Sequence, residues 1–87
     1  MNEMCHGELR LLFSRRFAKY RASHSLTQAQ MAEILGIDTR SYIDLEHGKN
    51  LCCTVVLLRF LVYCGDEAPS VIADARKCFD QADQTSA

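Results

Sequence analysis

The sequence predicts an all-α protein that folds as a single domain. Apolar residues recur at steps of three and four, the period of an amphipathic helix, and nowhere alternate as in a half-buried strand. The 87 residues have room for one compact core, because a domain usually takes about 100–200 residues. A hydrophobic fraction of 48% and a single proline are typical of a folded chain. We therefore expect residues 1–87 to form one domain.

The first two helices are predicted from their apolar faces and their ends. The first is expected from Glu8 to about Ala22. Its apolar face comprises Leu9, Leu12, Phe13, Phe17 and Tyr20. The second begins after Thr27, because Thr27 and Gln30 have the spacing of a capping box, in which each side chain binds a free backbone amide. Gly36 can end this helix in the left-handed conformation. Its inward residues are Met31, Ile34 and Leu35.

A third, short helix is predicted after a turn of about three residues. Asp38 or Thr39 can cap its start with a side-chain oxygen, and Gly48 can stop it. Tyr42 and Leu45 are three residues apart and are its expected inward side chains. The second and third helices therefore form a pair joined by a tight turn.

The C-terminal part of the chain predicts two further helices. One begins at Cys53 or Thr54 and ends at Gly65, and it is apolar on nearly every side except at Arg59. A helix that is apolar all round is buried all round, so one face is expected in the core and the other against a second subunit. The last helix covers about residues 70–82, and the residues after it are expected to fray. Its apolar stripe comprises Val71, Ile72, Ala75, Cys78 and Phe79.

The composition argues against several classes of protein. The net charge of −1 lacks the basic balance typical of a nucleic-acid binder, although the basic excess lies in the first half of the chain. No apolar run reaches the ~18 residues of a membrane span, and the N-terminus lacks the order of a secretion signal, so we expect a cytoplasmic protein. No nucleophile and base, phosphate loop or metal-ligand motif is present. We therefore expect no enzyme, no cofactor and no small-molecule substrate.

The five cysteines are odd in number and include no CxxC pair, which argues against a disulfide scaffold and favours buried thiols. The spacings of structural zinc motifs are also absent. The neighbouring Cys52 and Cys53 leave a redox or metal-sensing role open, which the reactivity of their thiols in the folded protein would test.

The run LTQAQMAEILGIDTRSYIDLEHGK, residues 26–49, resembles the helix-turn-helix of the phage-repressor and Cro-like family, also called the XRE family. The matching positions are Leu26, Thr27, Gln28, Met31, Ala32, Leu35, Gly36, Ile37, Tyr42, Glu46 and Gly48. The likeness covers about residues 13–65. It implies a five-helix lambda-repressor-like DNA-binding domain in which helices 2 and 3 form the helix-turn-helix.

The resemblance also implies roles for individual residues. The base contacts would come from Thr39, Arg40, Ile43 and Asp44, and the Arg40 guanidinium can bind guanine O6 and N7 together. The phosphate contacts would come from Gln28, Ser41, His47, Lys49 and Asn50. Arg21 and Glu46 would form a structural salt bridge, which turns Glu46 inward. Two assignments have alternatives, since Asp44 can lie on the solvent side and Ile43 can pack against the fourth helix or a partner.

These inferences predict a sequence-specific transcriptional regulator of the repressor type. It would bind double-stranded DNA as a homodimer, with two recognition helices about 34 Å apart. An alternative is a protein–protein interaction module that keeps this fold and binds a protein through the fourth helix and Ile43. The near-neutral charge and the acidic third helix favour that alternative. Titration with random duplex DNA at low salt would separate the two.

Overall fold

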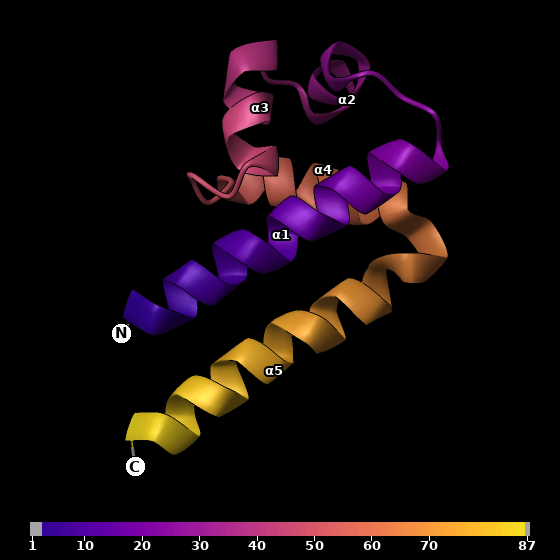
Figure 1. The fold of residues 1–87 in the computed structure, drawn as a ribbon. Coiled ribbons are helices and arrows are strands. Elements are labelled where there is room, and N and C mark those ends of the chain that lie inside the picture. The colour runs from indigo at the N-terminus through magenta and orange to yellow at the C-terminus, as the bar shows by residue number, and fades with distance from the viewer. Residues whose placement is uncertain (1–2, 87) are drawn as a thin grey trace.

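A computed structural model describes the backbone of residues 3–86 and the burial of residues 7–80 (Figure 1). In chain order its elements are α1 (Glu3–Ser23), α2 (Gln28–Leu35), α3 (Thr39–Glu46), α4 (Thr54–Cys64), the 3-10 helix η1 (Gly65–Glu67) and α5 (Ala68–Ser86). These residues contain no strand, so the prediction of an all-α class is confirmed for the described part of the chain. Within the same residues, no helix is both long enough and apolar enough to cross a membrane.

The helix ends follow local sequence signals where such signals exist. Thr27 and Gln30 form the predicted capping box: the Thr27 side chain accepts from the Gln30 amide at 3.1 Å, and the Gln30 side chain accepts from the Thr27 amide at 2.9 Å. Gly36 ends α2 with a left-handed φ of 75°. Asp38 caps α3 by accepting a hydrogen bond from the Ser41 amide at 3.0 Å.

Two helices are longer than the sequence predicts. α1 begins at Glu3, not Glu8, and α5 covers Ala68–Ser86, not about residues 70–82. Apolar periodicity marks only the turns that pack against a neighbour, whereas polar turns continue a helix once it is nucleated. The expected loop between the fourth and fifth helices is the single turn η1, so α4, η1 and α5 follow one another directly.

The core holds α1 against both α3 and α4. Phe17 of α1 packs its ring 4.7 Å from that of Phe60 on α4 and 6.3 Å from that of Tyr42 on α3. These three side chains are almost completely buried. The core residues are Leu9, Phe13, Phe17, Met31, Ala32, Leu35, Tyr42, Leu45, Val56, Phe60 and Val71. Aromatic packing on its inner face therefore fixes the position of α3.

α5 lies antiparallel to α1 and is attached to it by polar contacts (Figure 1). The Arg16 guanidinium of α1 donates to Ser70 Oγ at 2.9 Å and forms an ion pair with Asp74. These two contacts join residues that are 54 and 58 positions apart in the sequence. Arg16 is thus engaged within the fold.

Fewer apolar residues of α5 pack against the core than the predicted stripe contains. Val71 is buried, and Ala75 and Cys78 pack against the core as partly buried residues. Ile72 and Phe79 are 55% and 45% exposed, so the prediction that they pack inward is wrong. The residues that pack against the core, Val71, Ala75 and Cys78, are separated by steps of four and three and therefore lie on one side of the helix. Ile72 and Phe79 each follow one of these residues directly and lie beside the contact.

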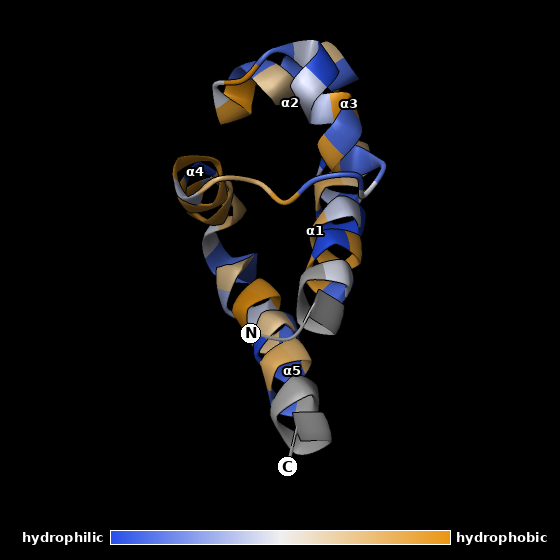
Figure 2. Cartoon of the chain, turned by 90° about the vertical axis from the view of Figure 1, so that its left-hand side faces the viewer, coloured by the Kyte–Doolittle hydropathy of each residue, from blue (hydrophilic) through white to orange (hydrophobic). Residues whose placement is uncertain are grey.

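α4 has one buried face and one exposed face. Val56 and Phe60 are buried in the core, whereas Val55, Leu58 and Val62 are exposed. Figure 2 shows the hydrophobic colouring of α4 on both sides of the helix. The expectation that one face of this helix lies in the core is therefore confirmed, and within the described residues no element covers the second face, whose contact with a second subunit stays a prediction.

Candidate nucleic-acid interface

α2 and α3 form a compact pair that leaves the start of α3 exposed. Three residues join the two helices, and the pair packs through Met31 and Leu35 on α2 and Tyr42 and Leu45 on α3. Thr39, Arg40 and Ser41 at the start of α3 are all exposed. Five predicted contact residues lie on this short helix, and two of them, Ile43 and Asp44, are half-buried. The first turn of α3 is therefore free to meet another molecule.

A hydrogen-bond network centred on Glu46 locks the orientation of α3. Arg21 of α1 donates to both carboxylate oxygens, with Nε–Oε2 at 2.8 Å and Nη2–Oε1 at 2.9 Å. Gln28 at the start of α2 donates to Oε1 at 3.2 Å, and the Tyr42 hydroxyl donates to Oε2. Arg21 also donates to the Leu26 carbonyl at 3.1 Å. One carboxylate thus connects α1, α2 and α3.

The network determines the charge state of its members. Burial alone would raise the pKa of Glu46, but hydrogen bonds from Arg21, Tyr42 and Gln28 outweigh burial and hold this pKa below its ordinary value. Burial and the hydrogen bond to Glu46 raise the pKa of the Tyr42 hydroxyl. The carboxylate is therefore ionised at neutral pH, and the buried hydroxyl remains a donor.

The other two acidic residues of this region also have partners. Asp38 accepts from the Ser41 hydroxyl at 2.6 Å as well as from its amide, and these bonds lower the pKa of Asp38. The Asp44 carboxylate lies 3.8 Å from Arg40 Nε and 3.9 Å from Lys49 Nζ. Arg40 and Lys49 remain largely exposed, at 79% and 61% of the side chain. The negative charge of Asp44 is therefore balanced locally.

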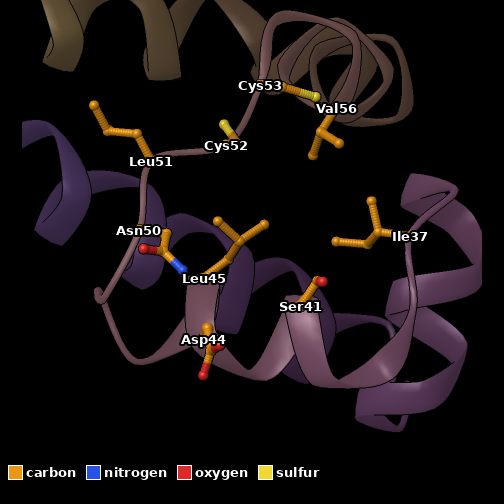
Figure 3. Close-up of a pocket in the computed structure, with 9 residues that line it drawn as sticks. All are labelled: Ile37, Ser41, Asp44, Leu45, Asn50, Leu51, Cys52, Cys53 and Val56. Carbon is orange, nitrogen blue, oxygen red and sulfur yellow. The ribbon is translucent and has the colours of Figure 1, made fainter.

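An open hollow of about 430 Å³ lies beside α3 (Figure 3). Ser41, Asp44 and Leu45 of α3 border it on one side. Asn50, the loop that follows it and the start of α4 border it on the other. The hollow brings Asn50, a predicted phosphate-contact residue, next to the exposed side of α3.

The predicted phosphate-contact residues occupy different environments. His47 is exposed at the end of α3, where its amide donates to the Ile43 carbonyl at 3.0 Å, and Lys49 and Asn50 are exposed in the loop after it. Ser41 is exposed, but its hydroxyl already donates to Asp38. The half-buried Gln28 directs its amide to Glu46. These residues surround α3 without forming one cluster.

The Tyr42 hydroxyl is a member of the Glu46 network that sequence reasoning missed. Tyr42 was expected only as an inward apolar residue. Its spacing of four residues from Glu46 on the same helix could have indicated the contact, since side chains four apart are neighbours on a helix surface.

The burial of the described cysteines agrees only in part with the prediction of buried thiols. Cys52, Cys64 and Cys78 are partly buried, and burial raises the pKa of Cys52 and Cys64. Cys53 is exposed, so the prediction of a buried thiol is wrong there, because its position as the cap of α4 turns it away from the core. Among the described residues, no group of three or more His, Cys, Asp or Glu side chains could hold a metal ion.

Comparisons with protein-family models, with curated proteins and with solved structures found no match for this chain. Its function is therefore inferred from the exposed start of α3, the network that holds this helix and the charges around it.

Proposed function

We propose that the protein binds double-stranded DNA through α2 and α3. In this proposal the chain is a five-helix lambda-repressor-like domain, and α2, the turn and α3 are its helix-turn-helix. More specifically, it acts as a sequence-specific transcriptional regulator of the repressor type. It functions as a homodimer whose two copies each insert one α3 into the major groove.

The exposed first turn of α3 is the observation that carries this proposal. Thr39, Arg40 and Ser41 are exposed to solvent, while Tyr42 and Leu45 fix the opposite side of the same helix. A recognition helix needs this combination, because its side chains must reach base edges while its axis stays fixed. Arg40 is best suited to read a base, since its planar guanidinium matches the two acceptors of guanine.

The acidic residues of α3 are compatible with DNA binding because each has a cationic or capping partner. Three acidic side chains at α3 and the three basic side chains that surround it form a group with no net charge. They are Asp38, Asp44 and Glu46, and Arg21, Arg40 and Lys49. A neutral site gains little from counterion release, so affinity would depend on groove fit and hydrogen bonds. We therefore expect a shallow salt dependence, with a slope of about one for each phosphate contact.

Selection of bound duplexes from a random pool tests the proposal, followed by titration of the selected sequence. Arg40→Ala should weaken binding about 10- to 100-fold and relax the preference at one base pair. Arg76→Ala is a matched control, because Arg76 is 82% exposed and lies 3.8 Å from Asp80 with the same spacing of four residues. An absence of duplex binding at low salt would refute the proposal. Equal effects of the two variants would remove the role assigned to Arg40.

A second candidate function is a protein–protein interaction module, and the exposed apolar face of α4 favours it. Val55, Leu58 and Val62 form an uncovered patch that DNA binding by α3 does not use. In this alternative the chain keeps its fold and binds a protein through α4 and Ile43. It predicts no affinity for duplex DNA, so the same titration distinguishes the two functions.

A further inference from the structure

The uncovered face of α4 forms a shallow apolar groove with one cation at its side. Five residues line this groove of about 270 Å³, and we call them the α4 groove: Val55, Leu58, Arg59, Val62 and Tyr63. The four uncharged members are all more than half exposed. Such a concentration of exposed apolar side chains on one helix indicates an interaction surface.

We propose that the α4 groove binds an amphipathic helix of a partner protein that places a carboxylate against Arg59. The inference names a partner for the α4 surface of the second candidate function, and it does not depend on DNA binding by α3. The chemistry of this partner follows from the spacing of the groove, the position of Arg59 and the cost of covering an unpaired cation.

The spacing of the groove matches a helix better than an extended peptide. Val55, Leu58 and Val62 follow one another at steps of three and four, which keeps them in line along one side of α4. This line is roughly 10 Å long, or two helical turns. The apolar residues of a partner helix recur at the same steps, so they can enter such a groove. An extended peptide needs a free strand edge, and the described residues contain no strand.

The guanidinium of Arg59 is positioned at the side of the groove that faces α2. An ideal β-carbon on Gly36 would lie 3.2 Å from both Cζ and Nη1 of Arg59. Gly36 ends α2, so the cation lies close to the carbonyl end of that helix, which favours positive charge. Within residues 7–80, Arg59 has no hydrogen-bond or ion-pair partner. The cation is therefore held in place and keeps its donors for another molecule.

The unpaired cation restricts what can cover the groove. A partner that covers the apolar residues also removes water from Arg59, and a charge that loses water without gaining a partner is costly. A carboxylate beside the apolar face of the partner offsets this cost, because it can accept two parallel hydrogen bonds from one guanidinium. A basic helix would add repulsion instead. The groove therefore favours an acidic amphipathic helix.

A second copy of this chain does not supply the required charge. Along the axis of α4, Arg59 lies midway between Val55 and Tyr63, four residues from each. A two-fold pair centred on the groove would bring the two Arg59 cations together in either orientation of the helices. The five lining residues include no acidic side chain that could compensate. The groove thus suits a different protein as its partner.

Titration of the full chain with two synthetic peptides tests the proposal. Both are alanine-based helices of about 20 residues with leucines at steps of three and four, and they differ only in carrying glutamate or lysine beside the leucines. The chain should bind the glutamate peptide with a Kd of about 10–500 µM, because the groove is small beside a stable interface of about 800 Å² per partner. The lysine peptide should bind at least about 10-fold more weakly. Equal affinities, or amide NMR shifts that avoid α4, would overturn the proposal.

Variants of the full chain identify the groups that bind the peptide. Arg59→Glu should reverse the preference, so that the lysine peptide binds at least about 10-fold more tightly than the glutamate peptide. Arg76→Glu is the control, since Arg76 is 82% exposed and lies on α5, and it should keep the wild-type preference. Val62→Asp should weaken both peptides at least about 10-fold, because it places a carboxylate in an apolar contact. Ile72→Asp, at a similarly exposed position of α5, should bind both as wild type does. Equal effects of a variant and its control would contradict the proposal.

Other occupants of the groove would give different results. Self-association of the wild-type chain that Val62→Asp removes, measured by sedimentation equilibrium, would assign the groove to a second copy. Binding to vesicles of phosphatidylcholine and phosphatidylserine that the same variant removes would assign it to a membrane surface. Either result would overturn the proposal. None of these measurements contains DNA. Loss of peptide binding with intact DNA binding would therefore remove this inference alone, and the reverse result would remove the proposed DNA-binding function alone.

Discussion

Replacing Glu46 by glutamine tests whether one carboxylate holds the three N-terminal helices together. Glu46→Gln keeps the shape of the side chain but removes its charge and turns one acceptor oxygen into a donor. That amide would face donors from Arg21 and Tyr42, which now share the two carboxylate oxygens. The substitution therefore weakens several hydrogen bonds at once.

The size of the effect follows from the exposure of each partner. Hydrogen bonds to charged groups contribute about 1.5–3 kcal/mol and neutral ones about 0.5–1.5 kcal/mol. Arg21 is 28% exposed and can rebind water, whereas Tyr42 is fully buried and cannot. After this discount we expect a loss of about 2 kcal/mol in the free energy of unfolding. For a domain of this size that corresponds to about 8–16 °C in Tm.

The pH dependence supplies a second measurement. The folded state lowers the pKa of Glu46 from its ordinary value of 4.5, so the stabilisation is complete above that value and is lost as the pH falls through the folded pKa. The stability difference between wild type and Glu46→Gln should therefore be full at neutral pH and shrink below pH 4.5. Comparison with the variant separates Glu46 from the other carboxylates.

Urea unfolding followed by circular dichroism, at pH values from about 3 to 7, measures both effects. Glu33→Gln is the matched control, because Glu33 is exposed on α2, and it should change stability by less than about 0.5 kcal/mol. A loss in Glu46→Gln no larger than the control, or a difference that persists unchanged at low pH, would refute this account of the network.

Four substitutions at three positions test the backbone conformation by the same unfolding assay. Gly36→Ala should destabilise by about 1–2 kcal/mol or more, since Gly36 has a φ of 75° and the new β-carbon would press on Arg59 at 3.2 Å. Gly7→Ala should instead stabilise the fold by about 0.5–1 kcal/mol, because Gly7 lies within α1 and an added β-carbon would have its nearest contact at 3.7 Å. If Gly36→Ala and Gly7→Ala changed the free energy of unfolding in the same direction, the assigned conformations would be contradicted. Ser25 has a φ of 55°, in the left-handed region that favours glycine. Ser25→Gly should therefore raise the free energy of unfolding by up to about 1 kcal/mol, and Ser25→Val should lower it by at least as much. An unchanged stability in Ser25→Val would exclude the left-handed turn.

The sequence predicts most of the local structure because the responsible signals are close together in the chain. Thr27 and Gln30 are three residues apart and define the start of α2 on their own. Gly36 ends it because a left-handed residue is required there. The three- and four-residue period likewise identifies Phe17 and Tyr42 as core residues, since helix periodicity needs no knowledge of the partner helix.

What the sequence does not predict depends on contacts between distant segments. Arg16 belongs to the basic face of α1, and nothing near it indicates its ion pair with Asp74 on α5. The exposure of Ile72 is equally invisible, because it depends on how closely α1 and α5 approach each other. Local pattern thus indicates which residues are apolar, whereas tertiary packing decides which of them are covered.

The charge of α3 shows how local and distant contacts combine at the candidate interface. A count of charged residues alone sets Asp44 and Glu46 against a nucleic-acid contact, although the family resemblance already implied that Glu46 pairs with Arg21. Glu46 depends on Arg21, which is 25 residues away in the chain, whereas Asp44 depends on Arg40 and Lys49 nearby. The surface that α3 presents to solvent is therefore less negative than a count of its charged residues suggests.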